Sequence, residues 1–324
     1  MPDGAGYHDA VPTASGEQHV LVAGDQEAVV TEVGATLRSY VCAGRDVCWG
    51  FAADEISGGG RGQVLAPWPN RLQDGAYEFD GLRAQAALDE PGRSNAIHGL
   101  VRWVPWRLLE RSDPATVRLG YVLFPQPAYP FQVRLEVRYR LDARGLGVTI
   151  SATGEGERRA PFGAGFHPYL SVSPGTVDEA RISLPARQRL LLDGRGLPIG
   201  SEDVAGTPYE AVAGPAGLEA RPALGSMRLD DCFADLALDA DGRWRARLAT
   251  GEPGSVTELW ADGSFGYLMC FTGDSLPAGD RRRGIAIEPM TCPPDALRSG
   301  EGLVVLEPGE RFEASWGIVP PVRG

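Results

Sequence analysis

Lysine is absent from this 324-residue sequence, and all 31 of its basic residues are arginines. Without a lysine amine the chain can form neither a Schiff base with a carbonyl substrate nor a phosphate-binding P-loop. Acidic residues number 43, so the formal net charge is -12 at pH 7. Because such a chain repels polyanions, neither nucleic acid nor an anionic membrane surface is expected as a partner.

Paired cysteine motifs and long apolar runs are also missing. The chain has no C-x-x-C pair, and its five widely spread cysteines are an odd number, which is typical of reduced thiols. The N-terminus shows no basic patch followed by an apolar stretch, and no apolar run has the length of a membrane span. These features predict a cytoplasmic protein.

A long apolar period of 3.6 residues, the pattern of a helix, is absent too. Glycine (43) and proline (26) are abundant, which suits many short strands joined by turns. Apolar residues alternate with charged ones over Val133–Leu141, and the alternation resumes over Leu146–Ile150 after a polar turn. A period of two indicates a strand with one wet face, so these segments predict a hairpin.

The remaining apolar segments are short and predict further strands. They cover residues 19–22, 28–33, 36–41, 256–260, 267–271, 303–306 and 312–319. Residues 193–225, rich in glycine and proline, are expected to be a long surface excursion. We predict a flexible tail over residues 1–18 and a single domain over 19–324. The fold class is all-β, a large antiparallel β-sandwich.

Only four histidines could serve in proton transfer near neutral pH: His8, His19, His98 and His167. The first two lie in a polar N-terminal stretch. His98 precedes a glycine just after a polar turn, which suggests an exposed position. His167 precedes Pro168, which pushes it toward extended geometry and fixes the angle of its ring. The alternative for His167 is a histidine that packs in the core.

Arg71 lies in a segment confined by Pro67 and Pro69, directly after Asn70. A guanidinium offers five donors in a planar fork, which suits several hydroxyl or carboxylate oxygens. The alternative is a structural ion pair.

Acidic residues within apolar segments are the other candidates. Glu288 follows the apolar Ile285–Ile287 and precedes a proline. Burying an ionised carboxylate is costly unless a partner or a substrate compensates, so Glu288 is either functional or paired with an arginine. Asp230 and Asp231 are adjacent, and neighbouring strand residues face opposite sides, so only one of them can face a given site.

The tryptophans and the arginine run each allow two interpretations. Trp68, Trp103 and Trp106 lie near these segments, and their rings could stack on sugars or pack in the core. Arg281–Arg283 is either a solvated loop or a phosphate-binding one. Histidine and carboxylate ligands could form a mixed metal site, but no H-x-H, H-E-x-x-H or clustered cysteine motif is present. A G-x-S-x-G elbow is absent as well, which disfavours a serine hydrolase.

Together these pieces resemble the aldose 1-epimerase (galactose mutarotase) family. Each piece is short, but they follow the order of the family along nearly the whole chain. They are Val33–Leu37, Pro67–Leu72, Gly75–Gly81, Asn95–Gly99, His167–Tyr169, Asp230–Phe233, Ile287–Pro289 and Pro294–Ala296.

The resemblance implies a β-supersandwich and an active site on one sheet face that needs no cofactor and no metal. It implies that Glu288 is the general base and His167 the general acid, and that Arg71, His98, Asp230 and Asn70 bind the substrate. The expected partner is a small aldose sugar, and the protein is expected to be a monomer or a homodimer.

The expected reaction is interconversion of the α and β anomers of a free hexose. One alternative is a hexose-6-phosphate 1-epimerase, with Arg281–Arg283 holding the phosphate. Another is a non-catalytic sugar-binding protein, which the Glu288 and His167 pair disfavours because a binder needs no proton-transfer groups.

Overall fold

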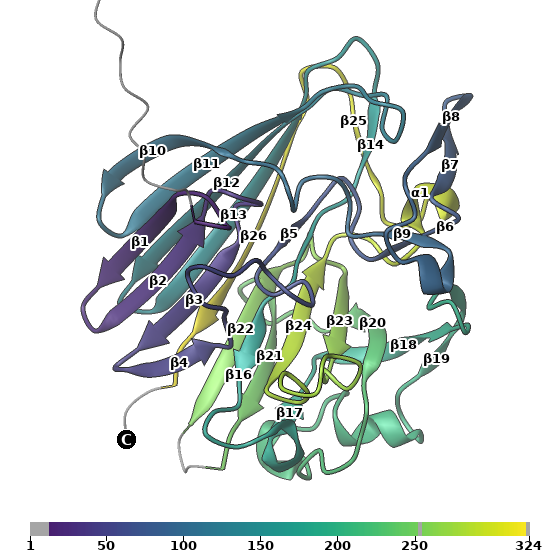
Figure 1. The fold of residues 1–324 in the computed structure, drawn as a ribbon. Helices are drawn as coiled ribbons and strands as arrows, with labels where there is room; N and C mark the ends of the chain where they lie inside the picture. The colour runs from purple at the N-terminus through teal and green to yellow at the C-terminus, as the bar shows by residue number, and fades with distance from the viewer. Residues whose placement is uncertain (1–12, 252–254, 322–324) are drawn as a thin grey trace, which may run out of the picture.

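The computed structural model describes residues 13–251 and 255–321. Their strands form two large antiparallel sheets, one 12-stranded and one 8-stranded, and three two-stranded sheets (Figure 1). The buried side chains between the two large sheets belong to one continuous hydrophobic cluster. The expected all-β sandwich is confirmed.

The 12-stranded sheet carries most of the residues discussed below. In spatial order its path is β1 (Gln18–Ala23), β2 (Gln26–Thr31), β3 (Leu37–Cys42), β4 (Arg45–Cys48), β16 (Tyr169–Ser171), β24 (Gly284–Met290), β23 (Tyr267–Phe271), β20 (Asp230–Leu236), β18 (Ala186–Leu192) and β19 (Pro198–Asp203). Off this path, β15 (Gly165–Phe166) pairs with β24 and with β5 (Val64–Leu65).

The 8-stranded sheet forms the other layer. Its order is β10 (Arg107–Asp113), β11 (Thr116–Leu123), β12 (Val133–Asp142), β13 (Gly145–Gly154), β26 (Arg311–Val319), β22 (Val256–Asp262), β21 (Arg243–Ala249) and β17 (Arg181–Ser183). The small pairs are β14 (Ala160–Phe162) with β25 (Val304–Leu306), β6 (Arg71–Gln73) with β9 (Asn95–Ile97), and β7 (Ala76–Phe79) with β8 (Leu82–Gln85).

Helix is scarce in the described residues. Within residues 13–251 and 255–321 there is one short α-helix, α1 (Ala296–Ser299), and there are 3-10 turns over residues 91–93, 177–179, 208–211 and 218–220. In the described part of the chain no helix has the length and apolar character that crossing a membrane requires.

The predicted hairpin is present as β12 and β13, which pair in antiparallel register from Val133 with Gly154 to Asp142 with Gly145. Burial alternates along β12 as the sequence pattern requires: its apolar side chains are buried and its charged ones are exposed or half-buried. The strands predicted over residues 256–260 and 267–271 are also confirmed, as β22 and β23.

One expectation about local structure needs correction. The stretch 193–225 is not only an excursion, because it contains the edge strand β19. The strand predicted from His19 is confirmed as β1, where His19 has 1% of its surface exposed. Residues 1–12 of the expected tail lie outside the described residues.

Side-chain alternation along β24 decides which residues face away from the core. Ile285 and Ile287 belong to the central hydrophobic cluster. Glu288 and Met290 flank Pro289 on the opposite face, where Met290 belongs to a small hydrophobic cluster with Met269 of the neighbouring β23. The outer face of the 12-stranded sheet therefore presents a carboxylate from the middle of the molecule.

Candidate active site

A cavity of about 510 Å³ lies on this outer face, over β20, β23 and β24. The pair β6 and β9, with the loops that flank it, forms part of its wall. All six residues that the sequence predicted for a site line this cavity: Glu288, His167, Arg71, His98, Asp230 and Asn70.

Glu288 and His167 meet at the base of the cavity. The distance between His167 Nε2 and Glu288 Oε1 is 3.2 Å, and only 5% and 2% of the two residues' surfaces are exposed. Glu288 Oε2 is also buried and has no hydrogen-bond partner among the described residues. A carboxylate oxygen is thus left with free acceptor capacity at the base of the cavity.

Burial shifts the protonation of both groups toward their uncharged forms. Desolvation lowers the pKa of His167 to about 3. Desolvation, and after it the nearby Asp230 carboxylate, raises the pKa of Glu288 well above its ordinary value. Burial therefore favours an uncharged pair that shares one proton over an ion pair.

Tyr169 and Gly60 both pack closely against the imidazole of His167. The Tyr169 ring stacks on it with centroids 5.0 Å apart and planes 15° from parallel, and the Tyr169 hydroxyl donates a hydrogen bond to the Gly59 carbonyl. Gly60 has φ +79°, and a Cβ at this position would come within 2.6 Å of the His167 ring. Glycine is required there because it tolerates positive φ and leaves room for the imidazole.

His98 is buried, with 8% of its surface exposed, which corrects the expectation of an exposed position. Its backbone has φ 64°. Its Nδ1 accepts a hydrogen bond from the Asn70 backbone N–H at 3.2 Å. Burial, then the neighbouring His167 and two arginines, lowers the pKa of His98 well below its usual value, so the ring is neutral. A neutral imidazole that accepts at Nδ1 carries its proton on Nε2, which makes Nε2 a donor.

This tautomer bears on metal binding. One ligand atom each from His98, His167 and Glu288 lies within 4.8 Å of the others, which is compact enough to suggest a metal site. A metal ligand must offer a lone pair, however, and in the arrangement seen here the proton on His98 Nε2 occupies it. The three residues fit a proton-transfer site with one fixed donor better than they fit a metal centre.

Arg71 forms the other part of the cavity. Its Nε and Nη2 donate to both oxygens of Glu90 at 3.0–3.2 Å, and its Nη2 lies 3.7 Å from Asp230 Oδ2. Arg93 Nη1 lies 3.7 Å from the same Asp230 oxygen. Although burial alone would raise the pKa of Glu90, hydrogen bonds from Arg71 and Asn95 hold it below its usual value. The side chains at the cavity rim therefore form a network of ion pairs.

The sequence profile of the aldose 1-epimerase family matches residues 18–318 of this chain. The chain belongs to the aldose 1-epimerase family.

Other comparisons agree with this membership. The uncharacterized protein YihR of Escherichia coli K12 is 31% identical over 310 residues, which cover 94% of this chain and 93% of YihR. A GalM/aldose epimerase homologue from C. elegans superposes with a TM-score of 0.80 at 17% identity, over 94% of this chain and 99% of that one. A galactose 1-epimerase from Lactobacillus acidophilus NCFM does so with a TM-score of 0.73 at 20% identity, over 92% of each chain. At such identities the two structures show a shared fold.

The predicted residues of this aldose 1-epimerase family member occupy distinct positions. Asp230 faces the cavity, whereas Asp231 bonds to Arg189 at 2.7 Å, as strand alternation requires. Asn70 uses its main chain to hold His98, and its side-chain oxygen accepts from the Arg71 backbone N–H at 2.9 Å.

The tryptophans and the 281–283 arginines also differ in whether they line the cavity. Trp68 and Trp106 are core residues with 2% and 1% exposed, whereas Trp103 lines the cavity with 49% exposed. In the 281–283 run, Arg282 is bonded to Asp178 and Asp274, and no member is among the described residues that line the cavity.

Glu90 and Arg93 were missed by sequence reasoning. They lie in the polar segment between β8 and β9, where neither an apolar pattern nor a motif marks them. Their role in the cavity appears only when this segment is placed beside Arg71 and Asp230.

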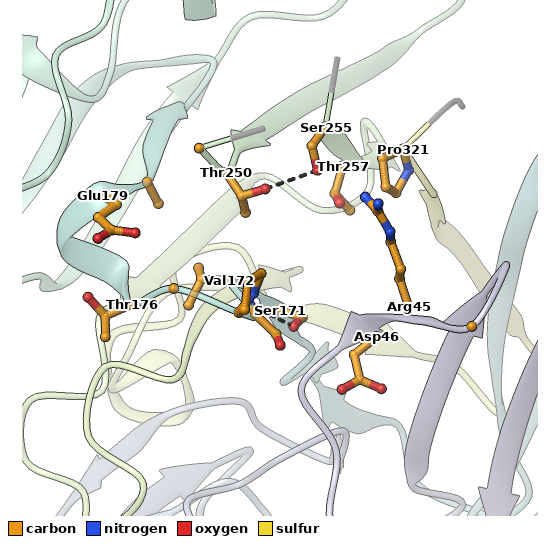
Figure 2. Close-up of a pocket in the computed structure, with 16 residues that line it drawn as sticks. Arg45, Asp46, Ser171, Val172, Thr176, Glu179, Thr250, Ser255, Thr257 and Pro321 are labelled. Carbon is orange, nitrogen blue, oxygen red and sulfur yellow. Dashed lines mark hydrogen bonds between the residues drawn. The ribbon is translucent and has the colours of Figure 1, made fainter. Parts of the chain in front are cut away.

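A second cavity of about 330 Å³ lies beside β4, β16 and the end of β21 (Figure 2). Its described lining is rich in hydroxyl groups, among which Thr250 donates to Ser255 at 2.9 Å. No histidine is among these lining residues, so the cavity offers no group that titrates near neutral pH. The site over β24 is therefore the better candidate for catalysis.

Proposed function

We propose that this protein is an aldose 1-epimerase that interconverts the α and β anomers of a free hexose. The observation that carries the proposal is the contact between Glu288 and His167 in a buried position at the base of a cavity. The ring oxygen and the C1 hydroxyl of an aldose are both bonded to C1. A base and an acid that lie only a few ångströms apart can therefore serve both oxygens at once.

The proton balance of the reaction fits a pair of this kind. Glu288 takes the proton of the C1 hydroxyl, while His167 gives a proton to the ring oxygen as the C1–O bond to the ring breaks. The open-chain aldehyde rotates about the C1–C2 bond. The hydroxyl that was the ring oxygen then attacks the other face of the aldehyde carbon and gives its proton to His167. Glu288 gives its proton to the aldehyde oxygen, which becomes the new C1 hydroxyl.

Four further residues suit the binding of the sugar. His98 presents its Nε2–H as a fixed donor beside the reacting pair. Arg71 and Asp230 offer donors and acceptors for hydroxyls farther along the sugar ring. Trp103 provides a half-exposed indole face of the kind that packs on the C–H face of a sugar.

The charges in the cavity favour a free sugar over a sugar phosphate. Its arginines already face acids: Arg71 faces Glu90, Arg93 faces Asp230, and Arg102 pairs with Asp89. A dianionic phosphate would have to compete with these carboxylates, and the 281–283 arginines lie outside the described lining.

Polarimetry of freshly dissolved α-glucose and α-galactose tests the proposal. We expect the protein to accelerate mutarotation, with a higher kcat/KM for the free sugars than for their 6-phosphates, and without loss of rate in EDTA. A preference for the 6-phosphates would favour the phosphate enzyme. Sugar binding without any acceleration would identify a non-catalytic binding protein and overturn the proposal.

A further inference from the structure

The turn between β18 and β19, residues 193–197, lies against the guanidinium of Arg71. Gly196 in this turn has φ +77°, and a Cβ there would come within 2.7 Å of Arg71 Nη1 and 2.9 Å of its Nε. This close approach is possible only for glycine. The turn therefore packs directly against the Arg71 side chain, although it lies about 120 residues from Arg71 in the sequence.

Arg195, the neighbour of Gly196, bonds this turn to the segment that carries Glu90 and Arg93. Its Nε donates to the Arg93 carbonyl at 2.9 Å, and its Nη2 donates to the Ser94 carbonyl at 2.6 Å. The same Nη2 lies 2.8 Å from Asp74 Oδ1 and 3.2 Å from Asn95 Oδ1. One guanidinium therefore fixes several acceptors of a segment that has little regular structure of its own.

Asn95 connects this contact to the ion pair in the cavity. Its side chain is fully buried, and its Nδ2 donates both to the Arg195 carbonyl and to Glu90 Oε2, each at 2.9 Å. Glu90 in turn holds Arg71 with both oxygens. A continuous chain of bonds runs from Arg195 through Asn95 and Glu90 to Arg71.

We propose that Arg195 and Gly196 are positioning residues for sugar binding: together they set the direction in which the Arg71 guanidinium points into the cavity. The inference rests on the proposed function, because it takes Arg71 to bind a sugar hydroxyl. Arg195 fixes Glu90 from one side, and Gly196 limits the guanidinium from the other. Neither touches the reacting pair, so both act on substrate affinity and not on the proton-transfer step.

Gly196→Ala is the sharpest test, and Gly206→Ala is its matched control. Gly206 has the same φ of +77° but no atom within 4 Å of a Cβ placed there. Both variants carry the backbone strain of alanine at positive φ, but only Gly196→Ala displaces the Arg71 side chain. We expect KM for the preferred aldose to rise about tenfold or more in Gly196→Ala with kcat within about twofold, and neither to change in Gly206→Ala.

Arg195→Met and Arg195→Lys give a second measurement should Gly196→Ala fail to fold. Methionine removes every donor, so KM is expected to rise as in Gly196→Ala. A lysine ammonium can still reach part of the acceptor set, so Arg195→Lys should recover part of the affinity. A merely structural role would lower the melting temperature of both Arg195 variants without moving KM.

The outcomes separate this inference from the proposed function. If the wild-type protein binds aldoses but does not accelerate mutarotation, the proposed function fails, and the same variants are compared by their dissociation constants, measured through intrinsic tryptophan fluorescence. If wild type is active and Gly196→Ala matches Gly206→Ala while Arg195→Met keeps the wild-type KM, the positioning role is overturned.

Discussion

The deep end of the cavity favours uncharged side chains, whereas its rim holds side chains in ion pairs. At the deep end, Glu288 and His167 lie in contact with almost no exposed surface, and desolvation drives both toward their neutral forms. At the rim, Arg71 forms ion pairs with Glu90 and Asp230, and the Asp230 side chain is 41% exposed. Desolvation shifts the pKa values of two groups so that they can exchange a proton, whereas an ion pair holds its side chains in a fixed geometry. Substitutions at the two ends should therefore change different kinetic constants.

Loss of the deep-end base should have the largest effect. Glu288→Gln keeps the size and most hydrogen bonds of the side chain but cannot accept a proton. General acid–base groups contribute about 10²–10⁴-fold, so we expect a loss of that order in kcat. His167→Asn should lose a similar factor, and the double variant should lose less than the product of the two, because the residues act as one relay. Polarimetric progress curves measure all three.

The melting temperature is the control for this comparison. Glu288→Gln removes a buried carboxyl without emptying its volume, so we expect little change in stability. A near-normal kcat for mutarotation in Glu288→Gln would rule out Glu288 as the general base, whatever the change in KM.

The pH dependence follows from the shared proton. The active state has Glu288 ionised and His167 protonated, which is a form of the pair that carries one proton in total. The profile of kcat/KM should therefore be bell-shaped, with limbs where the pair gains a second proton and where it loses its last one.

His167→Asn should simplify this profile to one acidic limb. Only Glu288 then titrates, and the base must be ionised, so the rate rises with pH through the pKa of Glu288. Because burial raises that pKa, the limb should lie above 4.5, with the rate falling about tenfold per pH unit below it. A limb at or below 4.5 would contradict the desolvation of the deep end.

Arg71→Ala tests the rim, with a smaller effect that appears in KM. Losing hydrogen bonds from a charged group costs about 1.5–3 kcal/mol, which corresponds to a rise in KM of about ten- to a hundredfold. We expect kcat to change much less than KM. Arg159→Ala is a suitable control, since it removes the Arg159 to Asp80 pair, which is not part of the cavity lining. If Arg71→Ala unfolds the protein and the folded fraction keeps a normal KM, Arg71 is a structural ion pair.

Local patterns allowed much of the fold to be predicted. The alternation of Val133–Leu141 is a property of one strand, and it survives in β12 because that strand has one buried and one wet face. Strand β19 escaped prediction for the converse reason. It is an edge strand without a fully buried residue, so no side chain was required to be apolar.

The predicted candidate residues do come together in one cavity, but the partners that tune them could not be predicted. Arg71 and Glu288 were marked by their unusual local surroundings and by the family resemblance. Glu90 gains its place through Asn95, whose bond to Arg195 spans 100 residues. His98 likewise accepts its hydrogen bond from Asn70, 28 residues earlier. Contacts between distant segments leave no periodic signal in the sequence.

Trp103 should give the smallest effect, and it tests whether the rim also binds through an apolar surface. Aromatic packing contributes about 0.5–1.5 kcal/mol, which corresponds to a rise in KM of about two- to tenfold in Trp103→Ala. KM in Trp103→Phe should fall between the values for the wild-type protein and for Trp103→Ala, because phenylalanine keeps a smaller ring. Phe124→Ala is the control: Phe124 is 63% exposed and does not line the cavity, so its loss should leave KM unchanged. Isothermal titration with a slowly converted sugar gives the same comparison as dissociation constants. An unchanged affinity in Trp103→Ala would restrict sugar recognition at the rim to the polar network around Arg71.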